Sequence, residues 1–138
     1  MNALLESLQR DNEEMGRQVE ITGRVGAPLM GDPQRLKRCV GNLVENAVLY
    51  GGRAHVGVED GAKALTVKVH DEGPGIPEPM LERVFDPFFR LESSRNRDTG
   101  GSGLGLSIAR NIARAAGGDV SLRNLPTGGL EASLVLPR

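Results

Sequence analysis

Two asparagines four residues apart are the first side chains of this sequence whose type and spacing suit ligand binding. Asn42 and Asn46 lie in the stretch NLVENAVLYG, and at helical spacing they project from one face, beside the apolar stripe. A carboxamide oxygen is a neutral ligand suited to Mg²⁺, and its NH₂ group can donate to a phosphate oxygen. On this helix alone a solvent-facing or capping role is the better explanation, because asparagine is common at exposed positions.

An aspartate followed by a glycine-rich turn, DEGPGIP, begins at Asp71. Asp71 ends a predicted strand, and Gly73 and Gly75 allow a backbone turn that a side chain would block. A carboxylate fixed at a strand end can accept a hydrogen bond from an exocyclic amine such as that of adenine. A simple Asp-Gly turn explains the segment equally well.

The stretch GGSGLGLSIAR places four glycines within six residues and then continues as a predicted helix. Gly101, Gly103 and Gly105 let the backbone approach a ligand, and the start of a helix offers free N–H groups and a positive dipole end to phosphate. A flexible surface loop is the alternative, which the interleaved Leu104 and Leu106 disfavour because they anchor the loop to the core. Together the three segments predict one pocket for magnesium, adenine and phosphate.

The elements that must position these residues follow from the spacing of apolar residues. The pattern predicts a helix over 1–16, a strand over 18–23, a helix over 33–51, strands over 54–58 and 64–69, a short helical stretch near 79–85, a helix over 104–115, and a closing hairpin of 119–124 with 130–137. Helices do not alternate one-to-one with strands, so a doubly wound parallel sheet fits poorly. We expect an α/β (α+β) two-layer sandwich, with a mixed sheet of about five strands and about three helices on one face.

The composition excludes several classes of function. The chain has 138 residues, enough for one domain with a core, and its net charge of −1 gives no reason to expect a nucleic acid as partner. Cys39 is the only cysteine, so an internal disulfide and a multi-thiolate metal site are excluded, and its place on an apolar helix face indicates a core residue. No apolar run has the length of a membrane span and no signal peptide is evident, so we expect a soluble cytoplasmic domain.

In this order and spacing, four motifs of the chain resemble those of sensor histidine kinases. NLVENAVLYG, DEGPGIP, FDPFFR and GGSGLGLSIAR are similar to the N box, the first glycine box, the F box and the second glycine box of that family. The resemblance covers residues 18–138 and implies the Bergerat ATP-binding fold. It also implies the catalytic domain of a two-component kinase, with ATP and Mg²⁺ as cofactors.

The resemblance implies a role for each matching residue. Asn46 would be the Mg²⁺ ligand, Asn42 would support the phosphates, and Asp71 would read the adenine amino group. The other cofactor-binding residues would surround the base, sugar and phosphates: Tyr50, Gly73, Gly75, Ile76, Gly101, Gly103, Leu104, Gly105 and Leu106.

A lid between the two glycine boxes is also implied. Arg95, with Arg97 as a second, would supply a cation to the γ-phosphate, so Asn42, Asn46 and Arg95 form the expected catalytic set. Leu49 stands where many relatives place lysine or arginine, so one common phosphate contact is absent. Phe85, Phe88 and Phe89 would anchor the lid, although core packing explains Phe88 and Phe89 equally well. Arg90 would face the partner helix.

Neither histidine lies where a phosphoacceptor is expected. His55 falls within a predicted strand and His70 ends one, so both are interpreted as structural. The resemblance implies phosphoryl transfer to a histidine on a separate dimerisation hairpin, of which residues 1–16 could be the tail, with residues 17–138 as the catalytic domain. The expected partners are that hairpin and, downstream, a response regulator. The isolated domain is expected to be a monomer, derived from an inner-membrane sensor protein.

Two other functions remain open beside the kinase. Related ATPases of the wider superfamily place a glutamate where this chain has Asn42, and an amide cannot activate water, so hydrolysis should be slow. Glu45 lies about 100° round the helix from Asn46 and is a poor substitute. Phosphoryl transfer depends on positioning and charge neutralisation more than on a protein base, which favours the kinase. The alternatives are a serine kinase or nucleotide-dependent switch like the anti-sigma-factor kinases, and a degenerate docking domain, for which only Leu49 speaks.

Overall fold

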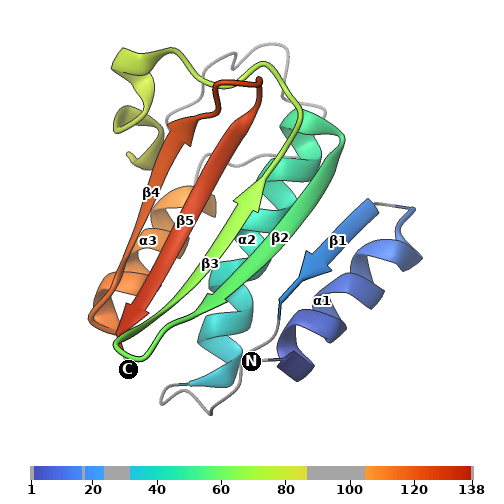
Figure 1. Cartoon of the computed structure of the whole chain (residues 1–138), viewed down its shortest axis with the longest axis vertical. Helices are drawn as coiled ribbons and strands as arrows, with labels where there is room; N and C mark the ends of the chain where they lie inside the picture. The colour runs from blue at the N-terminus through green and yellow to red at the C-terminus, as the bar shows by residue number, and fades with distance from the viewer. Residues whose placement is uncertain (1, 17, 24–31, 87–104, 138) are drawn as a thin grey trace.

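Five strands form one mixed sheet in the computed structural model, which describes residues 2–16, 18–23, 32–86 and 105–137. The strands are β1 (Gln18–Thr22), β2 (Arg53–Asp60), β3 (Ala64–His70), β4 (Asp119–Asn124) and β5 (Leu130–Pro137). Their order across the sheet is β1-β2-β3-β5-β4, and only the β1–β2 pair is parallel (Figure 1).

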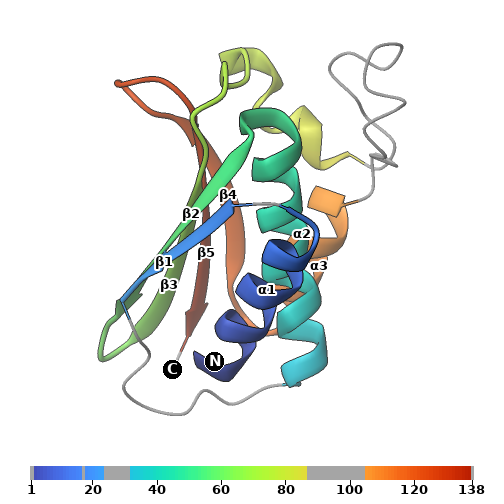
Figure 2. The same ribbon diagram turned by 90° about the vertical axis from the view of Figure 1, so that its right-hand side faces the viewer.

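Three helices cover one face of this sheet (Figure 2). They are α1 (Asn2–Glu14), α2 (Pro33–Gly51) and α3 (Gly105–Ala115). The arrangement confirms the predicted two-layer sandwich. In place of one short helix after β3 there are two single 3₁₀ turns, Glu78–Met80 and Arg83–Phe85, each closed by i→i+3 hydrogen bonds. Pro79, which has no N–H to donate, lies in the first of them.

Helix α2 begins and ends where its capping residues predict. The Asp32 side chain accepts a hydrogen bond of 2.9 Å from the backbone N–H of Gln34, and Pro33 occupies the first turn. At the other end Gly52 has a φ of 82° and donates its N–H to the Val48 carbonyl. The helix is therefore fixed in length by its own sequence.

The core lies between the helices and the sheet. Leu65, Val67 and Val69 of β3 are buried, while Thr66 and Lys68 between them lie on the opposite, polar face. From the helices, Val40, Leu43 and Val44 of α2 with Ala109 and Ala113 of α3 join the same cluster. The amphipathic pattern of each element is what assigns its buried face.

Cys39 is a core residue, as its position in the helix predicted. Its side chain is fully buried, and the thiol lies 3.3 Å from the Ala109 carbonyl, to which it donates. Burial raises the pKa of this thiol to about 11. It therefore acts as part of the α2–α3 packing.

Helix α1 packs against β1 and α2 within the same core. Leu5 and Leu8 are buried there, and Lys37 of α2 contacts both Ser7 (2.9 Å) and Asp11 (3.4 Å). Whether this helix also continues an acceptor hairpin stays a prediction. In the part of the chain that the structure describes, no helix combines the length and apolar character needed to cross a bilayer.

Both histidines lie in strands, on the polar face of the sheet. His55 and His70 are paired in the β2–β3 register and their rings stack with centroids 4.8 Å apart. The two nitrogens of His55 lie 2.9 Å from Glu20 and 3.7 Å from Glu72. That these histidines serve structure alone stays a prediction.

Candidate functional site

Helix α2 contacts both glycine-rich segments, one near its middle and one at its end. The Asn42 amide donates to the carbonyl of Gly105, the first residue of α3, at 3.3 Å. Nine residues further along, Gly51 packs directly against Asp71. At the helical rise these two contacts are about 13 Å apart. The helix therefore links the expected phosphate end of the site to the expected adenine end.

Asn46 lies between these two contacts and is half-buried. It shares a helix face with Asn42, one turn away. None of the described residues forms a hydrogen bond with its carboxamide, in contrast to the Asn42 amide. A neutral, partly sheltered oxygen of this kind suits a Mg²⁺ ion whose other ligands are phosphate and water.

Asp71 is buried, with 4% of its surface exposed, although it carries a carboxylate. Its Oδ1 accepts hydrogen bonds from the backbone N–H groups of Gly73 (2.9 Å) and Leu130 (3.3 Å). Burial raises the pKa of this carboxyl, against the opposing effect of those two amides and of nearby His70. No described residue donates to Oδ2, so that oxygen keeps its capacity to accept.

The bond to Leu130 separates this arrangement from a simple Asp-Gly turn. The Gly73 contact alone would be such a turn. The backbone of Asp71 also donates its N–H to the Leu130 carbonyl, so both its main chain and its side chain are held by β5. The carboxylate is thus fixed by tertiary contacts.

Gly51 has a role that sequence reasoning missed. A Cβ placed on it would overlap Asp71 Cβ and would lie 2.7 Å from Cγ and 2.9 Å from Oδ1 of the same residue. Cβ atoms essentially never lie this close to another heavy atom, so a side chain here would force Asp71 or the helix end to move. A glycine at the end of a helix is too common a signal to reveal this contact.

Asn124 is another residue that the sequence did not indicate. From the end of β4 its amide bonds both backbone groups of Ile76, accepting at 2.9 Å and donating at 2.6 Å. Ile76 itself is buried, and Gly75 beside it has a φ of 78°. The glycine turn is therefore attached to a strand almost fifty positions away.

Several expected site residues lie outside the described part of the chain. They are Arg95, Arg97, Gly101, Gly103 and Leu104, with Phe88, Phe89 and Arg90 of the F box, and the side chain of Tyr50. Of the second glycine box the structure describes Gly105, at the start of α3 with open space beside its Cα, and Leu106, which is buried. Leu49, where the resemblance led us to expect a missing phosphate contact, is half-buried.

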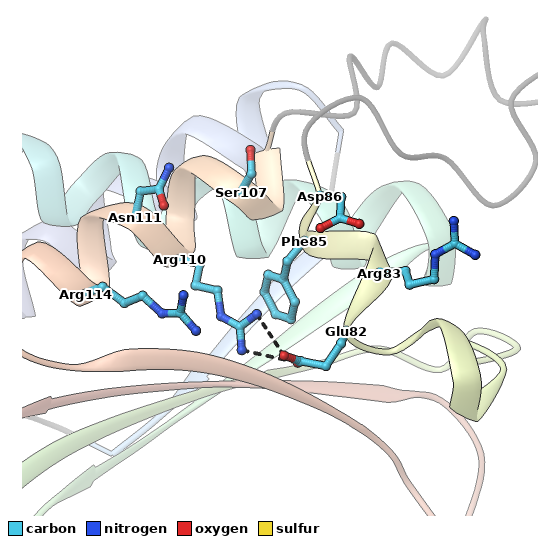
Figure 3. A pocket seen from close by; sticks show the side chains of 8 residues that line it. All are labelled: Glu82, Arg83, Phe85, Asp86, Ser107, Arg110, Asn111 and Arg114. Carbon is cyan, nitrogen blue, oxygen red and sulfur yellow. Dashed lines mark hydrogen bonds and ion pairs between the residues drawn. The ribbon is translucent and has the colours of Figure 1, made fainter.

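Phe85 of the F box is buried beneath an arginine of α3 (Figure 3). The Arg110 guanidinium carbon lies 3.9 Å from the ring centroid, and the group forms ion pairs with Glu82 (3.2 Å) and Asp119 (3.1 Å). Although partial burial opposes the charge, hydrogen bonds to these two carboxylates raise the pKa of Arg110. Phe85 and Arg110 border a groove of about 380 Å³, lined by Glu82, Arg83, Phe85, Asp86, Ser107, Arg110, Asn111 and Arg114.

Comparison with known proteins places the chain. A family model described as histidine kinase-, DNA gyrase B-, and HSP90-like ATPase matches residues 31–138. The sensor histidine kinase GtrS of Pseudomonas aeruginosa is 51% identical over 138 residues, which are 100% of this chain and 28% of that protein. CpxA of Escherichia coli is 33% identical over 136 residues, 97% of this chain and 30% of that protein. The solved catalytic domain of the histidine kinase ThkA superposes with a TM-score of 0.82 at 30% identity, covering 99% of this chain and 92% of that one.

The chain therefore belongs to the family of histidine kinase-, gyrase B- and HSP90-like ATPases. Within it, the chain is a catalytic ATP-binding domain of the sensor histidine kinase type, as the four motifs indicated. It spans less than a third of the length of the two curated relatives. The alternative of an anti-sigma-factor-type serine kinase is not favoured.

Proposed function

We propose that this domain binds Mg-ATP and presents the γ-phosphoryl group to a histidine on a separate helical hairpin. The observation that carries the proposal is the arrangement along α2. Asn42 bonds the start of α3, and the end of the helix packs on the buried carboxylate of Asp71. Asn46, whose carboxamide has no described partner, lies between these two contacts. Such a row offers a phosphate end, a metal ligand and an adenine acceptor in succession, and ATP carries its phosphates, with their Mg²⁺, at the opposite end from its adenine.

The adenine end would be read by Asp71. Its Oδ1 is already used by two backbone amides, which leaves Oδ2 to accept from the exocyclic amine. Because the carboxylate is held by backbone groups rather than by flexible side chains, it would need little reorganisation when the base binds.

The phosphate end would lie at the start of α3. The first N–H groups of a helix have no partner within the helix and attract anions. Asn42 fixes this end by donating to the Gly105 carbonyl, and Asn46 would hold Mg²⁺ by its amide oxygen. When bound, Mg²⁺ would neutralise charge on the phosphates. Arg95 of the expected lid and the remaining residues of the second glycine box complete the proposed set.

Transfer rather than hydrolysis fits the residues of α2. The position of the expected general base holds Asn42, whose amide donates to Gly105 and has no proton-accepting nitrogen. Glu45, the nearest carboxylate along the helix, is exposed and lines a groove beside α1. Water in the site would therefore lack a base, and the phosphoryl group would await an acceptor that is itself a nucleophile.

The proposed partners are the dimerisation hairpin that carries the acceptor histidine and, after it, a response regulator. Both proposals draw on the relatives, which are named as sensor kinases. The isolated domain is proposed to be a monomer that works on the cytoplasmic side of an inner-membrane sensor protein.

Calorimetric titration tests the nucleotide part of the proposal. Mg-ATP should bind to the domain, and Asn46→Ala should weaken binding about tenfold or more in Mg²⁺ while changing little without it, as expected when groups around a metal are lost. The exposed Asn111 of α3 provides the control, since Asn111→Ala should bind as the wild type does. Equal binding by Asn46→Ala and wild type in Mg²⁺ would refute the role of Asn46.

A transfer assay tests the kinase part. The domain is mixed with γ-labelled ATP and with the dimerisation hairpin of the Pseudomonas relative. That relative is 51% identical to the present chain over the 138 residues that they share. We expect acid-labile label on the hairpin and negligible ADP release in its absence. Rapid ADP release without the hairpin would favour an ATPase and implicate Glu45.

A further inference from the structure

We infer that Asn124 is a positioning residue for the adenine-reading turn, through which the β4–β5 hairpin controls how well the base is bound. The inference rests on the proposed function. Asn124 ends β4, on the far side of β5 from the strand that leads into the turn. Nothing in its position along the sequence connects it with the nucleotide.

The Asn124 amide bonds the turn as a neighbouring strand would. Its Oδ1 accepts from the Ile76 N–H at 2.9 Å, and its Nδ2 donates to the Ile76 carbonyl at 2.6 Å. The second Nδ2 hydrogen is directed to Glu78 Oε1 at 3.3 Å. Both donors of the amide are thus engaged by the segment that follows Asp71.

The turn has no side chain where this amide approaches. A Cβ on Gly75 would lie 2.5 Å from Asn124 Oδ1, and the φ of 78° at that residue is one that other residues rarely adopt. The second glycine of DEGPGIP is therefore explained by the amide that lies against it, in addition to any contact with a ligand.

The other arm of the hairpin holds the start of the same turn. Leu130, the first residue of β5, accepts a hydrogen bond from the Asp71 backbone N–H and donates its own N–H to Asp71 Oδ1. Gly129 before it has a φ of 94°, and a Cβ there would overlap the Asp71 carbonyl. The hairpin thus holds the turn at Asp71 and again at Ile76, five residues later, and the backbone between these points is fixed at both ends.

Asn124 touches neither the expected phosphates nor the metal ligand, so its effect should be confined to the base. Asn124→Asp is the informative change because it keeps the size and the acceptor for the Ile76 N–H. It removes both donors and places a carboxylate beside the Ile76 carbonyl and Glu78. Those neighbours favour protonation of the new carboxyl, and the protonated form regains one donor.

The experiment is calorimetric titration of the domain with Mg-ATP and with Mg-tripolyphosphate, which lacks the base. We expect Asn124→Asp to bind Mg-ATP about tenfold more weakly than the wild type at pH 8, and to recover most of that loss, relative to the wild type, at pH 6. Its affinity for tripolyphosphate should stay within about twofold of the wild-type value. Asn12→Asp is the matched control, because among the described residues that buried amide donates only to Leu8 of its own helix, and it should leave both affinities unchanged.

A second variant keeps the test valid if Asn124→Asp fails to fold. Asn124→Asp with Glu78→Gln removes the opposing carboxylate, so the double variant should fold and bind Mg-ATP with an affinity between those of wild type and single variant at pH 8. Unchanged Mg-ATP affinity in both variants, or equal weakening of ATP and tripolyphosphate, would overturn the inference. Failure of the wild type to bind Mg-ATP would instead overturn the proposed function, and this inference with it.

Discussion

Replacing Gly51 by alanine tests whether the close packing of α2 on Asp71 sets the position of the carboxylate. The added methyl would overlap Asp71 Cβ and lie 2.7 Å from Asp71 Cγ, whereas ordinary contact begins at 3.4 Å, so the methyl and the aspartate must separate by at least about 0.7 Å. Asp71 cannot yield freely, because Leu130 holds its backbone and its side chain. The methyl must therefore displace either the end of the helix or the carboxylate.

The expected cost can be divided between folding and binding. Overpacking costs about 1–3 kcal/mol, and alanine in a helix is about 1 kcal/mol more favourable than glycine. The free energy of unfolding should thus fall by no more than about 2 kcal/mol. A misplaced hydrogen bond to a charged group loses about 1.5–3 kcal/mol, which corresponds to a Kd for ATP that is roughly 10- to 150-fold weaker.

Calorimetry with Mg-ATP and urea unfolding of the same samples separate the two effects. Gly41→Ala is the matched control in the same helix, since a Cβ there meets only the end of the Leu8 side chain, at 3.3 Å. It should leave the ATP affinity unchanged. An unchanged Kd for Gly51→Ala would refute the view that this contact positions Asp71.

Three further outcomes are expected from single contacts. Burial raises the folded-state pKa of Asp71 above its unfolded value, so the wild type should lose stability relative to Asp71→Asn as the pH rises from the unfolded to the folded pKa. Its ATP affinity should fall as the pH drops through the folded pKa. Unfolding and binding measured over pH would show both effects, and a stability difference that does not change with pH would contradict the burial effect. The Cys39 thiol, with its pKa of about 11, should resist a thiol reagent in the native domain and react on unfolding, and rapid native labelling would contradict its packing. Arg110→Met should lower the free energy of unfolding in urea by about 1 kcal/mol, through loss of the contact with Phe85 and of partly exposed ion pairs, with a smaller effect at about 1 M salt.

The sequence predicts elements well where local chemistry defines them. The bounds of α2 follow from Asp32, Pro33 and Gly52, which cap the helix through neighbouring atoms. The strand predicted over 54–58 is longer, because its antiparallel pairing with β3 continues over Glu59 and Asp60. A pattern of apolar alternation cannot register charged residues at a strand end, since their backbone pairing depends on the partner strand.

The site divides in the same way. The motifs indicate Asn42, Asn46 and Asp71 because each belongs to a short segment with recognisable chemistry. They do not indicate Gly51 or Asn124, whose roles arise from contacts with residues 20 and 48 positions away. Contacts of that separation are made by the fold, and one sequence carries no local signal for them.

The place of β5 in the sheet has a consequence for how the domain is made. β5 inserts between β3 and β4, so one edge of β3 stays unpaired until the growing chain has passed Leu130. By that stage α2 and its asparagines have already been synthesised. An exposed edge of apolar character invites mispairing. A ribosome-bound chain of that length could form the α2 helix but would lack the amide of Leu130 that holds Asp71. We therefore expect the metal end of the site to take shape before the adenine end during synthesis.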